Sequence, residues 1–195
     1  MLEKKRQILR CARELFQQQG YKNTNVAEIM KRAGLGTGTF YNYFSSKDSL
    51  FMEIYLEENA ALKKRIVEGV DLDAEPLEVV RELTSRNLQG MLSNPILKEW
   101  YNRDVFEKIE RNFRKQKGLE QVDFLYDIFL DVVKRWQATG KMRKDIDAEM
   151  IMALFSAIIT VELHKEEIGF QYFPELIEHL LELVMKGLSD NPQTR

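Results

Sequence analysis

The sequence predicts an all-α protein, and three observations support this prediction. Apolar residues recur at helical spacing along most of the chain, and no convincing strand pattern appears. Glycine, proline and capping residues mark the ends of these apolar stripes. The length of 195 residues and the 44% share of hydrophobic residues suit one or two globular domains with a buried core. We therefore expect nine or ten helices and no sheet.

The first two helices are indicated by their apolar spacing and by their end signals. The first is expected from Lys4 to Gln19, with Gly20 at the position that follows a helix end. Asn25 is a good N-cap for the second, and Glu28 three residues later resembles a capping box. The buried stripe of the first helix is predicted to comprise Ile8, Leu9, Ala12, Leu15 and Phe16.

A glycine-marked turn follows the second helix. Ala33-Gly34 ends the apolar stripe, and the next four residues, 35–38, read Leu-Gly-Thr-Gly, in which glycines can adopt positive φ without steric cost. The run Thr39–Phe44 is then aromatic and hydroxylated and carries no charge. Two short helices across a tight turn form a helix-turn-helix, whose second helix enters the DNA major groove.

The rest of the chain is also expected to be helical. Ser45-Ser46 and Asp48 open a long helix from about Lys47 to Glu68, which Gly69 ends. Pro76 suits the first turn of the next helix, which stops at Asn94-Pro95. Further helices are expected at Ile96–Phe113, with Gly118 closing that stretch, and at Val122–Ala138, Asp147–Glu167 and Pro174–Gly187, before a polar tail at Asp190–Arg195.

The charge of the chain is unevenly distributed. Residues 1–56 hold nine Lys or Arg and five acidic residues, a net charge of +4, so the net charge of -2 leaves -6 for the remainder. A basic N-terminal segment followed by an acidic remainder suits a protein whose N-terminal segment binds phosphate groups. Uneven surface charge alone is equally compatible with a solvated surface.

Cysteine content and hydropathy indicate a cytoplasmic protein. The single cysteine, Cys11, excludes an intramolecular disulfide and suits a small buried apolar position. The chain begins MLEKKRQ, which is unlike a signal peptide. Its most apolar run, Met150–Leu163, is too short to cross a bilayer of about 30 Å.

The segment Ile8–Phe51 resembles the N-terminal domain of the TetR family of transcriptional regulators. ILRCARELFQQQGY is similar to the first helix of that family, and AGLGTGTFYNYFSSKDSLF is similar to its most diagnostic run. The resemblance implies a DNA-binding domain at residues 1–47 and a helical effector-binding and dimerisation domain at 48–195, joined by the helix at about 47–68. It also implies a sequence-specific transcriptional regulator, in particular a repressor released from a palindromic operator when a small molecule binds.

The same resemblance implies which residues contact DNA. Thr37 and Asn42 are expected at base edges, because a hydroxyl or an amide can pair with them. Because no Lys or Arg lies between Arg32 and Lys47, a bidentate contact from arginine to guanine is not expected from this segment. The contacts expected at phosphates or beside the reading surface are those of Thr24, Gly38, Thr39, Tyr41, Tyr43 and Lys47. Phe40 and Phe44 are expected in the core instead.

The last two predicted helices carry more apolar surface than one core requires. They either lie centrally in a monomer or form a four-helix contact with a second subunit. The resemblance favours the homodimer, since TetR regulators dimerise through their last two long helices. The predicted interface comprises Ile151, Leu154, Phe155, Ile158, Leu176, Leu180, Leu181 and Val184.

The resemblance also implies an effector pocket in the second domain. An aromatic and methionine-rich lining would favour an apolar or flat ligand, although these side chains also suit an ordinary core. The predicted lining residues are Met91, Trp100, Tyr101, Phe106, Phe124, Phe129, Trp136 and Phe155, with Phe113 and Tyr126 as further candidates.

Two alternatives compete with the ligand-responsive repressor. His164 with Glu167 and His179 with Glu182 each place a histidine and a carboxylate on one helical face, as in metal-binding bundles or enzymes. Charged, solvated helix faces explain both pairs as well, and no nucleophilic triad or phosphate-binding loop is evident. We therefore predict no enzyme, cofactor or metal site. The second alternative is an effector-independent TetR-like DNA-binding protein.

Overall fold

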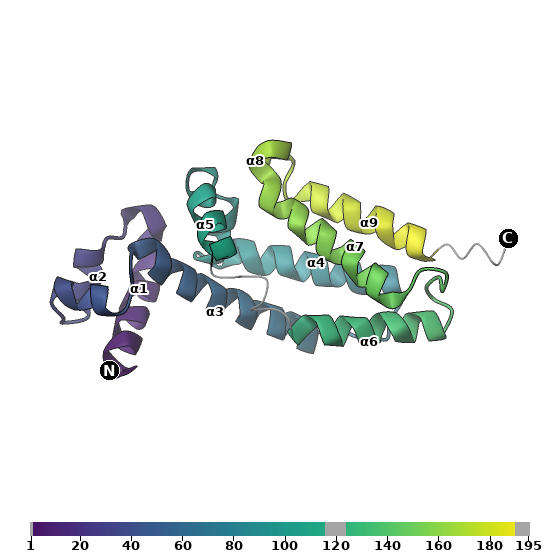
Figure 1. Ribbon diagram of the computed structural model, residues 1–195, viewed down its shortest axis with the longest axis horizontal. Helices are drawn as coiled ribbons and strands as arrows, with labels where there is room; N and C mark the ends of the chain where they lie inside the picture. Colours follow the sequence, from purple (N-terminus) through teal and green to yellow (C-terminus); the bar gives the residue numbers. More distant parts are fainter. Residues whose placement is uncertain (1, 116–123, 190–195) are drawn as a thin grey trace. The chain divides into compact units, whose positions relative to one another are not determined.

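A computed structural model describes residues 2–115 and 124–189, and its regular elements in those ranges are all helices (Figure 1). The predicted all-α class is confirmed. Three predictions lie outside the described residues: the end of a helical stretch at Gly118, the helix start at Val122 and the polar tail.

The chain divides into two compact units. Unit 1 comprises Met1–Lys63 and Gln89–Gln121, and unit 2 comprises Lys64–Leu88 and Val122–Arg195. Two helices, α3 (Lys47–Glu68) and α4 (Pro76–Ser93), contribute residues to both units. The predicted domain boundary after residue 47 stays a prediction.

Unit 1 begins with α1 (Leu2–Asn23) and α2 (Val26–Arg32). Helix α1 kinks at Gly20, where φ is 78°, a backbone conformation that favours glycine. The predicted N-cap is confirmed, because the Asn25 side chain accepts a hydrogen bond from Glu28 N. The Glu28 carboxylate accepts from Gln19 Nε2 at 2.8 Å, and so ties the start of α2 to α1.

Aromatic rings fill the centre of unit 1. Phe16 from α1 and Phe51 from α3 meet edge to face, with ring centroids 5.0 Å apart. Tyr21 lies at the same distance from Phe51. These contacts bury the predicted stripe of α1 against α3, with the exception of Leu9, which is half-buried.

The predicted helix Ile96–Phe113 is wrong as a single element. The structure has a 3₁₀ helix, η2 (Leu97–Tyr101), followed by α5 (Arg103–Lys115). The break lies at Asn102, whose ψ of 103° is extended and whose Oδ1 accepts a hydrogen bond from Asp104 N. A local side-chain cap therefore restarts the helix at a residue that periodicity alone does not distinguish.

Unit 2 contains α6 (Phe124–Ala138), α7 (Ala148–Val161) and α9 (Glu175–Ser189), with α7 packed on both of the others. Asp147 caps α7 by accepting from Met150 N, as predicted. The predicted end at Glu167 is wrong, because α7 stops at Val161. Three short elements follow: η4 (Glu162–His164), α8 (Lys165–Ile168) and η5 (Phe170–Tyr172).

A buried lysine lies in this turn between α7 and α9. The side chain of Lys165 is fully buried, and its Nζ lies 3.6 Å from Glu162 Oε1. The rings of Phe170 and Phe173 lie 5.8 and 5.9 Å from the same nitrogen. Burial lowers the pKa of Lys165 to about 8, although the carboxylate of Glu162 opposes this shift.

No helix among residues 2–115 and 124–189 is both long enough and apolar enough to cross a membrane.

Candidate nucleic-acid interface

The turn of the helix-turn-helix is closed by backbone hydrogen bonds around Gly34. Leu35 N donates to Met30 O at 2.9 Å, and Gly34 N donates to Lys31 O at 3.1 Å. Gly34 has a φ of 64°, so this closure requires the left-handed conformation that other residues rarely adopt.

The segment after this turn is a 3₁₀ helix, η1 (Thr37–Asn42). Its hydrogen bonds run from Thr39 N to Gly36 O and from Tyr43 N to Phe40 O, each 2.9 Å long. Gly36 provides no side-chain cap, and the segment has six residues, which is longer than most 3₁₀ helices.

The two faces of η1 differ sharply in burial. Phe40 is fully buried and Phe44 is buried beside it, which confirms that both belong to the core. Tyr41 is 64% exposed and lies edge-on against Phe40. Of the predicted DNA-contacting residues in this region, Thr37, Gly38, Tyr41 and Asn42 are exposed, while Thr39 and Tyr43 are half-buried.

Two glycines leave open space beside this exposed face. A Cβ atom built on Gly36 or Gly38 would meet no other atom within 4 Å. Neither residue has a positive φ, so the fold does not require glycine at these positions. Their lack of a side chain permits close approach of another molecule to the backbone.

The side chains of Thr24 and Lys47 both donate hydrogen bonds to backbone carbonyl groups within unit 1. Thr24 is 1% exposed, and its hydroxyl donates to Gly20 O at 2.8 Å. The Lys47 ammonium donates to Tyr21 O at 2.8 Å and to Thr24 O at 3.0 Å, and lies 4.1 Å from the centre of the Tyr21 ring. Partial burial lowers the pKa of Lys47. Their phosphate contacts stay predictions.

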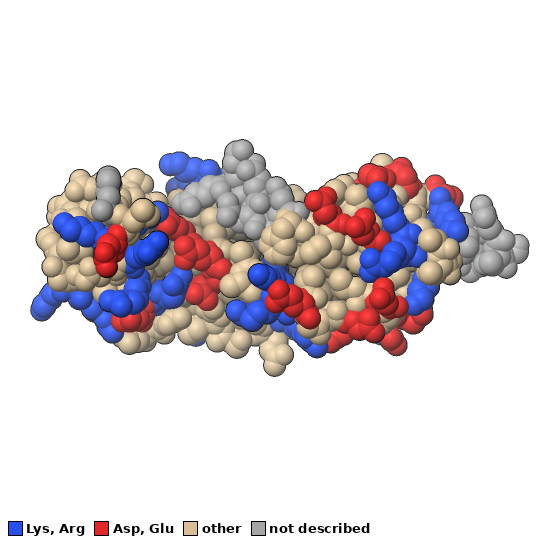
Figure 2. Space-filling model, turned by 90° about the horizontal axis from the view of Figure 1, so that it is seen from below, with Lys and Arg blue, Asp and Glu red and all other residues tan. Residues whose placement is uncertain are grey.

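Basic side chains lie on the surface of the N-terminal helices (Figure 2). Four of them form ion pairs within unit 1: Lys5 with Glu53, Arg13 with Glu57 and Glu58, Lys22 with Asp104, and Arg32 with Glu14. Lys4, Arg6, Arg10 and Lys31 are exposed. Because η1 carries no basic residue, these exposed charges lie on α1 and α2 instead.

A buried carboxylate that no sequence pattern predicts holds the end of α1. Glu99 is buried in η2, and its Oε1 accepts from Tyr21 N at 3.1 Å. Its Oε2 accepts from Asn102 Nδ2 at 2.7 Å. Glu99 and Tyr21 are separated by 78 residues, so no local sequence pattern could have indicated the contact.

The Tyr21 hydroxyl is also bonded within unit 1. It donates to Asp48 Oδ1, near the start of α3. Burial, followed by the hydrogen bond to Asp48 and the charge of that carboxylate, raises the pKa of Tyr21 well above its ordinary value. The hydroxyl therefore stays protonated as a donor at neutral pH.

The predicted effector-binding residues do not form one cluster within a unit. Met91, Trp100, Tyr101 and Phe106 belong to unit 1, where the Trp100 ring packs against Tyr55, Phe106 and Phe113. The others, Phe124, Phe129, Trp136 and Phe155, belong to unit 2, as does the further candidate Tyr126. Trp136 is buried, and its indole Nε1 has no hydrogen-bond partner among the described residues. The effector site stays a prediction.

The predicted dimer-forming residues differ in burial. Ile151 and Ile158 are already buried within unit 2, whereas Leu154 is exposed. Phe155, Leu176, Leu180, Leu181 and Val184 are half-buried. Other large apolar side chains of α7 and α9 are exposed, namely Met150, Ile159 and Leu183.

The histidine pairs of the metal-binding alternative lie apart from any larger cluster of ligands. His164 Nδ1 lies 2.5 Å from Glu167 Oε2, and Glu182 is paired with Arg81 and Lys186. Within the described ranges, no group of three or more His, Cys, Asp or Glu side chains is placed to hold a metal ion.

Comparison with known proteins agrees with this geometry. Residues 8–54, which include most of α1 and all of α2 and η1, match the bacterial regulatory proteins of the tetR family. This segment is a DNA-binding domain of the TetR family. This regulator is 25% identical over 161 residues to the HTH-type transcriptional repressor AcnR of Corynebacterium diphtheriae, covering 80% of this chain and 77% of AcnR.

Two further comparisons cover almost the whole chain. It is 29% identical over 188 residues to the fatty acid metabolism regulator protein of Bacillus subtilis, covering 93% of this chain and 94% of that protein. Its fold is similar to Thermus thermophilus FadR in complex with lauroyl-CoA, with a TM-score of 0.64, 23% identity and 94% coverage of each chain. The protein is thus a DNA-binding transcriptional regulator rather than an enzyme.

Proposed function

We propose that this TetR-family regulator represses transcription by binding a palindromic operator as a homodimer, with η1 of each subunit in the major groove. The exposed, uncharged face of η1 over buried Phe40 is the observation that carries the proposal. A rigid base and an exposed polar face are what a reading element requires, because base contacts depend on fixed positions.

The proposed contacts divide by chemistry. Thr37 and Asn42 are exposed and carry a hydroxyl and an amide that can bond base edges. Tyr41 and Tyr43 are proposed to donate their hydroxyl groups to phosphates. Gly36 and Gly38 let the backbone approach DNA closely, which explains glycine at two positions where the fold does not require it.

Selection of binding sites from random duplex DNA by the full-length protein tests this proposal. The expected result is a palindromic site whose half-sites are about 34–36 Å apart or at a related spacing. Enrichment of a single half-site would contradict dimeric recognition, and no enrichment would contradict sequence-specific binding.

Lys47→Ala is expected to weaken binding to all DNA sequences alike and to lower the slope of log K against log salt by about one unit. The reason is loss of one proposed phosphate contact at the start of α3. Binding should be measured by fluorescence anisotropy at several salt concentrations, with exposed Lys64→Ala of the same helix as the matched control. An altered base preference with an unchanged slope would contradict the phosphate contact.

The homodimer is proposed to form through α7 and α9. The support is the exposure of Leu154, Ile159 and Leu183 on these helices, since homodimer interfaces are more apolar than the rest of a protein surface. Sedimentation at micromolar concentration should give twice the chain mass of 23.0 kDa.

The proposed effector is an acyl-CoA thioester that binds unit 2. Support comes from the similarity to a fatty acid metabolism regulator and to a lauroyl-CoA complex, and from the unpartnered indole N–H of buried Trp136. Lauroyl-CoA should release operator DNA and quench Trp136 in a Trp100→Phe variant, with free coenzyme A as the control. Quenching without operator release would contradict an effector role.

A further inference from the structure

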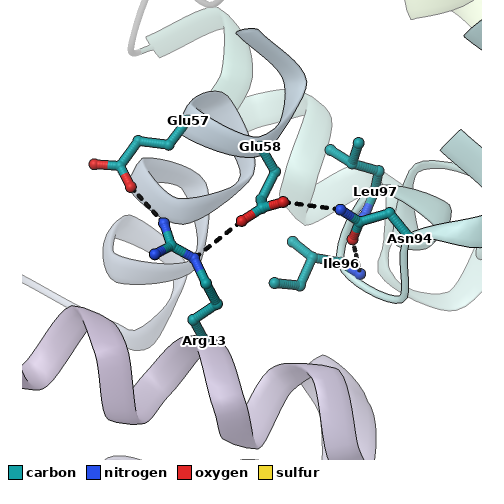
Figure 3. Close-up of polar contacts among 6 residues, drawn as sticks. All are labelled: Arg13, Glu57, Glu58, Asn94, Ile96 and Leu97. Carbon is teal, nitrogen blue, oxygen red and sulfur yellow. Dashed lines mark hydrogen bonds and ion pairs between the residues drawn. The ribbon is translucent and has the colours of Figure 1, made fainter. Parts of the chain in front are cut away.

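One carboxylate links α1 to the end of α4 (Figure 3). Glu58 of α3 places Oε1 3.0 Å from Arg13 Nε of α1. Its Oε2 accepts a hydrogen bond of 2.9 Å from Asn94 Nδ2, one residue beyond α4. Arg13 is also paired with Glu57, which is the preceding residue of α3.

Asn94 has no freedom to turn its amide over. While its nitrogen donates to Glu58, its Oδ1 accepts from Ile96 N at 2.9 Å and from Leu97 N at 3.3 Å (Figure 3). The chain therefore leaves α4 through a turn held by the same side chain that bonds Glu58. Reversal of the amide would break contacts on both sides.

Helix α4 is also packed tightly against α3 one turn earlier. A Cβ atom on Gly90 would lie 2.3 Å from Leu62 Cδ1, so glycine lets the two helices approach closely. Helices α3 and α4 are the described helices that contribute residues to both units. Any displacement of α4 within unit 1 would therefore act on α3 and, through Glu58, on α1.

We propose that Glu58 is a positioning residue for operator recognition, which sets the orientation of α1, and with it η1, relative to the end of α4. Its side chain is 22% exposed, against 52% for Glu57. Arg13 donates its hydrogen bond to Glu57 and forms an ion pair with Glu58, but of these two carboxylates it is Glu58 that accepts from Asn94. Charged contacts are stronger where water is partly excluded, so we assign the constraint at this junction to Glu58. Only the operator measurement below rests on the proposed function.

Three variants isolate this role. In Glu58→Gln, the amide oxygen can face either Arg13 or Asn94. The NH₂ group then faces the other of these two residues, which also presents a hydrogen-bond donor, so that contact is lost. In the double variant Glu58→Gln/Asn94→Asp, the new aspartate accepts from the glutamine NH₂ and still accepts from Ile96 N, so the pairing is restored at unchanged net charge. Glu57→Gln has the same charge change on the same arginine partner, without a contact to Asn94.

The first measurement needs no DNA or effector. Spin labels on exposed Gln17 of α1 and exposed Gln89 of α4, both in unit 1, report the distance distribution within one chain, in a Cys11→Ala background diluted with unlabelled chains. Glu58→Gln should broaden this distribution, Glu57→Gln should leave it unchanged, and the double variant should restore it. Equal distributions in the two single variants, or failure of the rescue in a folded double variant, would overturn the proposal.

The second measurement uses the duplex selected by the unmodified protein and a derivative with one base pair inserted between its half-sites. Glu58→Gln should reduce the preference for the selected spacing about tenfold. The reason is that an η1 whose orientation is less constrained can also bind a major groove displaced by the inserted base pair. Equal weakening on both duplexes would overturn a role in operator recognition. If the unmodified protein selects no palindrome, the proposed function fails, while the spin-label distances still decide whether Glu58 orients α1.

Discussion

Replacing Phe40 by alanine is expected to lower the free energy of unfolding by about 3–5 kcal/mol, the range for removal of a large buried aromatic side chain. Phe40 is fully buried beneath η1, and its ring contacts those of Tyr41 and Phe44. Because η1 is short and has no side-chain cap, this packing is its main support. The variant should therefore lose operator binding together with stability. Chemical denaturation with circular dichroism measures the first effect.

Tyr41→Ala provides the matched control for this prediction. The two residues are adjacent in η1, but Tyr41 is exposed. Surface substitutions usually change stability by less than about 0.5 kcal/mol, so Tyr41→Ala should remain folded and lose affinity for DNA. If Phe40→Ala unfolded at the same denaturant concentration as Tyr41→Ala, η1 would not depend on the buried ring.

Replacing Lys165 by methionine is expected to raise the free energy of unfolding at neutral pH by about 3 kcal/mol, the value that corresponds to a pKa lowered from 10.5 to about 8. Below pH 8, the folded protein contains a buried ammonium, and methionine removes its desolvation cost. Between pH 8 and 10.5, the unfolded chain keeps a proton that the folded protein has released. Stability of the unmodified protein should therefore rise with pH across this window, and the advantage of the variant should shrink.

Denaturant titrations of both proteins from pH 6 to pH 10 measure this dependence. Lys144→Met, which removes the same charge from an exposed position, is the matched control and should show no such convergence. A constant difference between Lys165→Met and the unmodified protein across the pH range would show that burial of the ammonium is not its cause.

Several elements could be predicted because short-range chemistry determines them. Asn25 and Asp147 cap helices through hydrogen bonds to residues three positions later. The long helix predicted from Lys47 to Glu68 is α3 with the same bounds. In these cases, the donor, the acceptor and the apolar stripe all lie within a few turns of one helix.

Other features could not be read from neighbouring residues. Asn102 divides a periodic stretch into η2 and α5, and the turn after Val161 ends α7 before the predicted residue. Lys47 was predicted from the family resemblance to contact phosphate, but its ammonium also closes the end of α1 through two carbonyl groups. The contacts to these carbonyl groups become apparent only when both helix ends are placed.

The sequence by itself determined that the protein is helical, that it carries a helix-turn-helix near its N-terminus, and that Phe40 is buried there. Those features follow from periodicity, glycine positions and a local motif. Only the tertiary structure decided that Glu99 holds Tyr21 and that Glu58 joins Arg13 to Asn94. The physical reason is that a carboxylate can accept from any donor the fold brings within about 3 Å, and sequence separation places no limit on that choice.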